Sequence, residues 1–119
     1  MPHETITTAA ESRFRLKHTR WGFADVGLSI SPIPERVVLL KSEVQSTELP
    51  EQFIDACFEG IRERAEEGPI EGYPIRGVEV TLLHAVYHPD HSTAESFRRA
   101  GSSAFKDLFL QAEPIVVGD

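Results

Sequence analysis

The sequence predicts an α+β protein, a two-layer sandwich in which two helices cover one face of a mixed β-sheet. Segments with strand-like alternation and segments with helical periodicity follow one another in the order β-β-β-α-β-α, and a short strand is expected at each end. The length of 119 residues fits a single domain, residues 1–119. Hydrophobic residues make up 40% of the chain, which is enough for a core and argues against disorder.

Three strands are predicted in the first half of the chain. In the first strand, Phe14 and Leu16 alternate with basic residues, as in a strand with one buried face. Gly22 then breaks the pattern and indicates a hairpin loop over residues 19–24. Pro32 ends the second strand, because proline cannot donate to the sheet. The three predicted strands span residues 12–18, 25–31 and 37–44.

The first helix is predicted to begin at Pro50, where a missing N–H costs nothing, and to stop at Gly68. Its apolar stripe contains Phe53, Ile54, Cys57, Phe58 and Ile61. A fourth strand follows, in which Val78, Val80 and Leu82 alternate.

A capping box formed by Ser92 and Glu95 is expected to open the second helix. Gly101 lies within the apolar stripe of this helix and suggests close packing against the sheet. Short terminal strands are expected at residues 4–7 and 114–117.

Counting strand directions places three loops at one end of the molecule, at residues 19–24, 45–49 and 87–92. The first and last of these loops combine basic and aromatic side chains, as contact with phosphates and stacking with bases require. The alternative is that Trp21 and Phe23 pack the hairpin while the charges are solvated, and composition alone favours this alternative. The candidate residues at this end are Lys17, His18, Arg20, Trp21, Phe23, Tyr87, His88, Asp90 and His91.

Composition narrows the classes of function. The formal charge of −7 argues against a protein that coats nucleic acid in general, although it allows a local basic contact. No apolar run is long enough to span a bilayer, and no signal peptide pattern opens the chain. Cys57 is the only cysteine, which excludes an internal disulfide and predicts a cytoplasmic protein.

The sequence offers only weak support for a catalytic site or a metal site. His84, His88, Asp90 and His91 have suitable ligand types, but their spacing on a strand and loop does not make them converge, so no metal is predicted. Cys57 lies on an apolar helix stripe, where a cysteine is usually a small hydrophobic residue. A phosphate-binding G-x-x-x-x-G-K-[ST] loop is missing, so no nucleotide cofactor is expected in this chain.

Several motifs of the second half resemble domain IV of translation elongation factor G. They are the L-P that precedes the first helix, the G-P-x-x-G-Y-P turn at residues 68–74, the Y-H of the last loop, and the A-G-S-x-A-F-K of the second helix at residues 100–106. The resemblance covers nearly the whole chain. It departs in the first hairpin loop, which has Gly22 as its only glycine, and at residues 84–86, where HAV replaces a D-G-S turn.

The resemblance implies a fold like the second domain of ribosomal protein five of the small subunit, with a left-handed β-α-β crossover. It also implies a non-catalytic domain that mimics the anticodon arm of a tRNA and contacts rRNA, mRNA and tRNA at the decoding site of the ribosome during translocation. GTP is expected only in a full-length parent, where another domain hydrolyses it. The tip residues that the resemblance itself implies are His88, Arg20 and Trp21, of which Trp21 differs in type from the family. Their place in the two loops adds Lys17, His18, Tyr87 and His91 to the predicted nucleic-acid contacts.

Two alternatives stay open. The stretch VGLSISPIP is more similar to tetracycline-resistance ribosomal protection proteins, which are relatives of elongation factor G. A free-standing domain that binds a protein partner or forms a homodimer is the other alternative, suggested by an exposed edge strand and an acidic helix face. A piece of a longer factor and a free-standing paralogue both fit the sequence.

Overall fold

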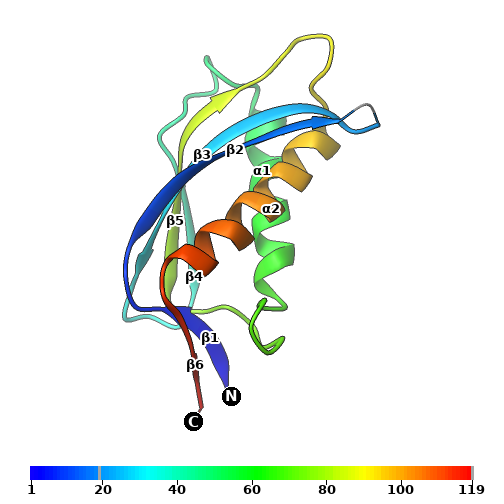
Figure 1. Ribbon diagram of the computed structural model, residues 1–119. Helices are drawn as coiled ribbons and strands as arrows, with labels where there is room; N and C mark the ends of the chain where they lie inside the picture. The colour runs from blue at the N-terminus through cyan, green and yellow to red at the C-terminus, as the bar shows by residue number, and fades with distance from the viewer. Residues whose placement is uncertain (19, 119) are drawn as a thin grey trace.

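A twisted four-stranded sheet with two helices on one face forms the body of the chain (Figure 1). The computed structural model describes residues 1–18 and 20–118. The predicted α+β order and two-layer arrangement are confirmed. The elements are β1 (His3–Ile6), β2 (Ala10–His18), β3 (Gly22–Pro32), β4 (Val38–Ser42), α1 (Glu51–Ala65), β5 (Val78–Val86), α2 (Ala94–Gln111) and β6 (Pro114–Val117).

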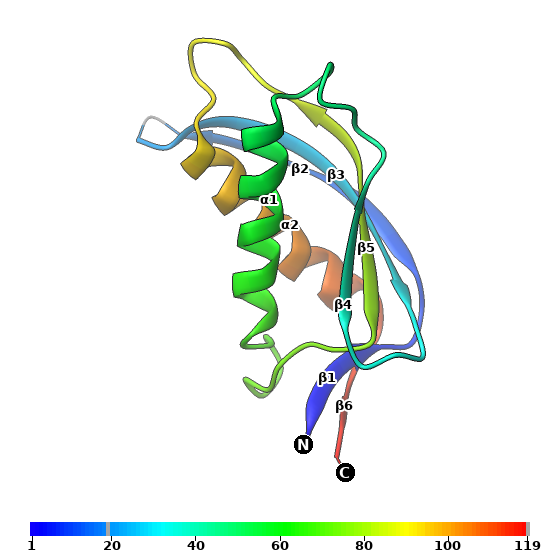
Figure 2. The same ribbon diagram turned by 180° about the vertical axis from the view of Figure 1, so that it is seen from behind.

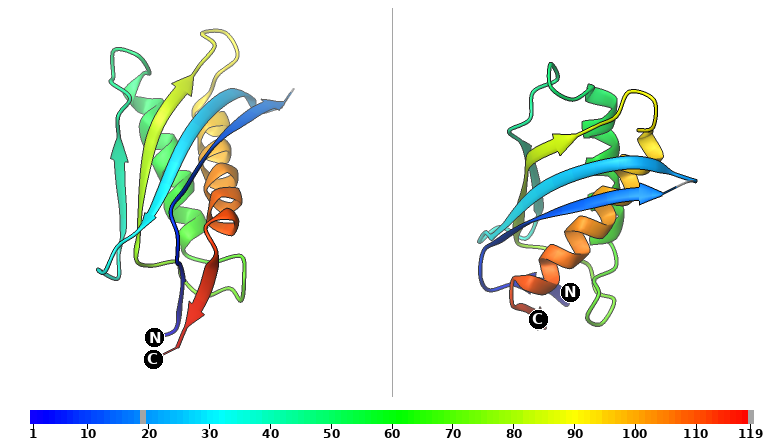
Figure 3. Two further views of the ribbon diagram at one scale, coloured as in Figure 1. Left: turned by 60° about the vertical axis from the view of Figure 1, so that its left-hand side comes forward. Right: turned by 45° about the horizontal axis from the view of Figure 1, so that its top comes forward.

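The main sheet has the strand order β2-β3-β5-β4. β5 lies between β3 and β4, pairing antiparallel with β3 and parallel with β4. β3 and β4 are therefore not paired in a hairpin, as the counting of strand directions had assumed, although the predicted directions hold. Viewed with the helices behind the sheet, β5 lies to the right of β4, so the crossover through α1 is left-handed (Figure 3, left).

The terminal strands pair with each other and form a separate ribbon. β1 is antiparallel to β6, so the two predicted terminal strands form a sheet of their own and β1 does not join the edge of the main sheet. The Glu4 carboxylate is fully buried and accepts backbone N–H groups from Ile70, Glu71 and Tyr73 at 2.8–3.1 Å. The ribbon is thereby tied to the turn that follows α1, and both termini lie at the end opposite the β2–β3 hairpin (Figures 1 and 2).

The core lies between the sheet and the helices. The inward residues of β3 and β5 are fully buried and meet Phe97, Phe105 and Phe109 of α2. Gly101 packs against α1 and not against the sheet as expected, because a Cβ there would overlap the backbone carbonyl of Cys57. Gly60 of α1 is likewise pressed against the Arg98 carbonyl, so the two helices cross with their backbones in contact.

Several helix and strand boundaries in the structure differ from those predicted. The capping box consists of Thr93 and Ser96, one residue later than predicted, because Ser92 instead donates its hydroxyl to the Phe23 carbonyl. β3 begins at Gly22, so the hairpin loop is shorter than residues 19–24, and Thr19 lies outside the described residues. α1 ends at Ala65 and not at Gly68, and Pro50 is its N-cap, not its first residue.

The sheet face opposite the helices stays uncovered in the described residues (Figure 3). A β-bulge in β5 opposite Gly27 shifts the alternation of that strand. Ala85 consequently packs on the core, whereas His84 and Val86 lie exposed on the open face. Arg13, Arg15 and Lys17 of β2 share this open face, because Phe14 and Leu16 point to the core.

Candidate nucleic-acid interface

The β2–β3 hairpin and the loop after β5 are joined by direct hydrogen bonds. The Phe23 N–H donates to the His91 carbonyl at 2.9 Å, and the Ser92 hydroxyl donates to the Phe23 carbonyl at 2.7 Å. The Thr93 hydroxyl donates to the Trp21 carbonyl at 2.8 Å. Two segments far apart in sequence, with Phe23 and Ser92 separated by 69 positions, thus form one continuous surface, as the counting of strand directions predicts.

Gly22 makes this contact sterically feasible. Its φ of +99° lies in the region that side chains rarely adopt, and a Cβ would overlap the His91 carbonyl oxygen. The single glycine of the hairpin therefore permits both the turn and the close approach of the second loop.

The Trp21 side chain is fixed by contacts with other residues of this chain. Its ring stacks on His18 with centroids 4.3 Å apart, and the guanidinium carbon of Arg99 lies 3.7 Å from the ring centroid. Arg99 Nε is 3.0 Å from a carboxylate oxygen of Glu95, an ion pair without hydrogen-bond alignment. Since these contacts engage the indole, Trp21 acts as an anchor of the hairpin more than as a free platform for a base.

Glu95 remains ionised beside these cations. A hydrogen bond from Arg98 lowers the pKa of the Glu95 carboxyl, and the charges of Arg98 and Arg99 lower it further against the effect of desolvation. A carboxylate in the first turn of α2 is also favoured by the helix dipole. Glu95 thereby supports the orientation of the arginine that lies over Trp21.

The loop that contains His88 and His91 is a compact turn. The His88 carbonyl accepts the N–H groups of His91 and Ser92, at 3.1 and 2.9 Å, and the Ser92 hydroxyl accepts the His88 N–H at 2.8 Å. Nδ1 of His88 accepts the Asp90 N–H at 3.2 Å, which leaves the proton of the neutral ring on Nε2. The two imidazoles lie 4.4 Å apart and present donors at the surface.

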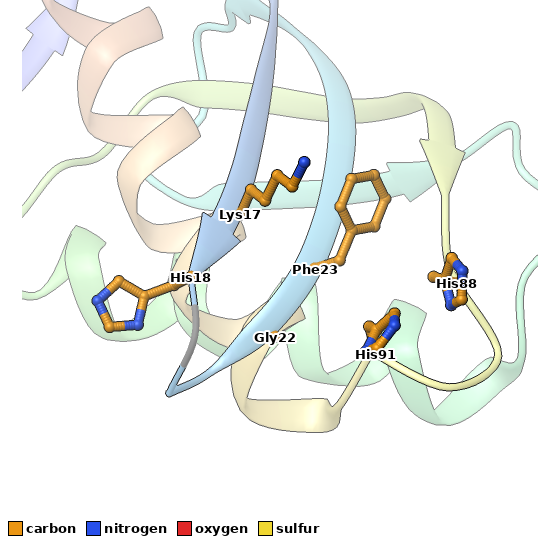
Figure 4. Close-up of a pocket in the computed structure, with 6 residues that line it drawn as sticks. All are labelled: Lys17, His18, Gly22, Phe23, His88 and His91. Atoms are coloured by element: carbon orange, nitrogen blue, oxygen red, sulfur yellow. The ribbon is translucent and has the colours of Figure 1, made fainter.

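A surface hollow of about 860 Å³ joins the two segments. Figure 4 shows Phe23, His88 and His91 on one side of the hairpin, whereas the His18 ring points away from them. The residues around the hollow are Lys17, His18, Gly22, Phe23, His88 and His91.

Three predicted tip residues do not line this hollow, namely Trp21, described above, and Arg20 and Tyr87. Arg20 is exposed at the hairpin turn, where its N–H donates to Nδ1 of His18 at 3.0 Å. Tyr87 turns inward, and its ring lies 5.8 Å from that of Phe53. The structure therefore places Lys17, His88 and His91 around one hollow, stacks His18 on Trp21 at its border, and leaves Tyr87 as a packing residue.

Sequence reasoning missed Arg99 and Thr93, which hold the hairpin on the start of α2. Arg99 appears in the sequence as one more charge on a helix, and no local signal links it to a tryptophan 78 residues earlier. Thr93 has a stronger signal, since hydroxyl residues before a helical segment are typical caps.

In the part of the chain that the structure describes, no three His, Cys, Asp or Glu side chains lie close enough to hold a metal ion. His84 borders a different hollow on the open sheet face and does not join His88 and His91. None of the described helices has the length and apolar character that crossing a membrane requires.

Comparisons with known proteins agree with this geometry. The family model for elongation factor G, domain IV, matches residues 1–113. Elongation factor G 2 of Hahella chejuensis is 33% identical over 114 residues, which cover 93% of this chain and 17% of the relative. Elongation factor G of Salinibacter ruber is 30% identical over 122 residues, which cover 96% of this chain and 17% of the relative.

A crystal structure of a Thermus thermophilus protein superposes with a TM-score of 0.83 at 29% identity. The match covers 97% of this chain and 18% of that protein. The chain thus spans less than a fifth of the length of these relatives. On the evidence of the family model and the shared fold, the chain belongs to the elongation factor G domain IV family.

Proposed function

We propose that this chain is a non-catalytic ribosome-binding domain of an elongation factor G-like translation protein. Its hairpin and its 87–92 loop contact rRNA, mRNA or tRNA at the decoding site during translocation, as a mimic of a tRNA anticodon arm. The observation that carries the proposal is the clamp between Phe23 and the loop, through His91 and Ser92, because it makes one rigid surface from both segments.

The chemistry of this surface suits RNA. Lys17 and Arg20 are exposed cations that can contact phosphates, and His88 and His91 supply imidazole donors beside the Phe23 ring. Because intramolecular hydrogen bonds fix both segments, little conformational entropy is lost on binding.

The shape of the chain also supports the proposal. The molecule measures 47 by 26 by 19 Å, and the hairpin and the last loop lie at the end away from both termini (Figure 1). Such an elongated shape would let these loops enter a recessed site. We propose a cytoplasmic location and no cofactor in this chain, with GTP bound by another domain of a full-length parent.

Cosedimentation with purified small ribosomal subunits tests the proposal. We expect the chain to pellet with subunits at low salt, and His88→Ala or Arg20→Ala to reduce the bound fraction by about threefold or more. Arg62→Ala, which removes an exposed cation from α1, is the matched control and should bind like wild type. Binding that neither tip substitution changes would contradict the proposed tip.

A homodimer or another protein complex is the second candidate. β2 is one of the two outer strands of the main sheet, and its free edge is not paired with another described strand. Light scattering after size exclusion tests the homodimer, because a strictly monomeric chain at high concentration excludes it.

A further inference from the structure

The open face of the sheet carries a row of cations on β2. Arg13, Arg15 and Lys17 occupy alternate positions and point away from the helices. Alternate residues of a strand lie about 6.8 Å apart. The row therefore presents regularly spaced positive charges. The strand that carries them runs toward the hairpin (Figure 3).

A buried carboxylate holds two of these cations in place. Asp25 Oδ1 lies 3.1 Å from Arg13 Nη2, and Asp25 Oδ2 lies 3.1 Å from Nε and Nη2 of Arg15. The Asp25 side chain is only 4% exposed, whereas those of Arg13 and Arg15 are 58% and 67% exposed. Two fixed guanidinium groups thus share one negative charge, which leaves excess positive charge and free N–H donors facing solvent.

A hollow of about 240 Å³ lies beside this pair. Gly27 occupies the middle of β3, and a Cβ there would come within 3.4 Å of both His84 and Arg13. A glycine inside a strand is typical of a place where another molecule or backbone approaches closely. The residues around this hollow are Glu11, Ser12, Arg13, Gly27, Leu83 and His84.

The formal charge of residues 13–25 is positive, whereas that of the whole chain is negative. Residues 13–25 contain Arg13, Arg15, Lys17 and Arg20 but only one carboxylate, so their formal charge is +3. The remaining residues together carry −10, given a total of −7. A polyanion is therefore attracted to residues 13–25 more than to the remaining chain, and Glu11 at the start of β2 marks the far end of this positive row.

We propose that the open sheet face binds the phosphodiester backbone of one RNA strand along β2. Arg13 and Arg15 contact successive phosphates, and Asp25 is a positioning residue that fixes both guanidinium forks. The inference rests on the proposed RNA-binding function and adds a second surface, outside the tip. RNA is favoured over an acidic peptide because the planar forks match phosphate oxygens and the half-buried Phe23 ring, 5.9 Å from the Arg15 guanidinium, offers a stacking surface.

The test measures fluorescence anisotropy of a labelled single-stranded RNA of about 12 nucleotides over a range of salt concentrations. The variant Arg13→Gln/Arg15→Gln/Asp25→Asn removes both forks without leaving a buried carboxylate unpaired. It changes the net charge by one unit, so Arg62→Gln on α1 is a control with the same change. Circular dichroism melting establishes that each variant is folded.

The triple variant should bind RNA about tenfold more weakly at low salt than Arg62→Gln does. Its slope of log K against log salt should fall by about 1.4, since each phosphate contact on a single strand contributes about 0.7. Should the triple variant fail to fold, NMR titration of the wild-type chain replaces it. RNA should then shift the amide resonances of residues 13–17 and leave those of α1 unmoved.

Equal slopes for the triple variant and Arg62→Gln, or unshifted β2 amides, would overturn the inference. Displacement of the RNA by polyglutamate at equal charge concentration would also overturn it, in favour of an acidic protein partner. The cosedimentation assay with ribosomal subunits tests the proposed function independently of this second surface. Loss of ribosome binding in His88→Ala, with normal binding by the triple variant, keeps the proposed function and removes only this second surface.

Discussion

The guanidinium carbon of Arg99 lies 3.7 Å from the centre of the Trp21 ring, and this contact joins the hairpin to the first turns of α2. Arg99→Ala should loosen the hairpin, because a cation–π contact contributes about 0.5–2 kcal/mol. The measurement is hydrogen exchange at the Phe23 amide, which donates to the His91 carbonyl and should exchange faster in the variant.

Lys106→Ala is the control for Arg99, because Lys106 lies about two turns further along the same helix. It removes the same charge and should leave exchange at Phe23 unchanged. Equal acceleration in both variants would mean that charge, and not stacking on Trp21, holds the hairpin.

Glu4 joins the N-terminal strand to the turn after α1 by accepting three backbone N–H groups. Glu4→Ala should lower the free energy of unfolding by about 3 kcal/mol, because hydrogen bonds to a charged group are strong and the donors lose their partner. Urea denaturation measures the loss. Glu71→Ala changes an exposed carboxylate in the same turn and should stay within about 0.5 kcal/mol of wild type. A similar loss in both variants would contradict this role of Glu4.

Gly101 allows the backbones of α1 and α2 to touch at Cys57. An alanine inside a helix normally stabilises it by about 1 kcal/mol relative to glycine. Gly101→Ala should instead destabilise the fold by about 1–3 kcal/mol, because the added methyl forces the helices apart. Thermal melting gives the sign directly. Ser103→Ala, on the same helix and partly exposed, serves as the control and should be close to neutral.

Periodicity predicted the type and order of the elements because each strand and helix of the sandwich has one buried face. It could not predict that β5 lies between β3 and β4, since β-strand alternation contains no information on the neighbouring strand. The sequence also could not predict whether Ser92 or Thr93 caps the second helix. The outcome depends on Phe23, whose carbonyl accepts the hydrogen bond of the Ser92 hydroxyl. Counting strand directions nevertheless predicted that the two loops of the candidate site lie at the same end of the molecule.

The contacts of individual residues were harder to predict than the end of the molecule at which they lie. Trp21 was expected at an RNA-contacting tip, yet the structure surrounds it with His18 and Arg99. The arginines of β2 appear in sequence as the solvated face of a strand. Only the burial of Asp25 between them distinguishes an ordered pair from ordinary surface charges.

Cys57 provides a pH-dependent test of the helix interface. Burial raises the pKa of its thiol from an ordinary value of 9.0 to about 12. The folded state therefore keeps its proton at pH values where the unfolded state releases it. The stabilisation is complete below pH 9.0 and is lost as the pH rises toward about 12, by about 1.4 kcal/mol for each pH unit.

Urea denaturation at pH about 8 and about 10 measures this loss, and Cys57→Ala is the reference because it lacks the thiol. The variant should be less stable at the lower pH, since it leaves a small void between the helices, but it should lose less stability on going to the higher pH. The difference between the two pH dependences isolates Cys57 from the lysines and tyrosines that titrate in the same range. Identical dependences would show that the thiol titrates alike in the folded and unfolded states, and would contradict its close packing against Gly101.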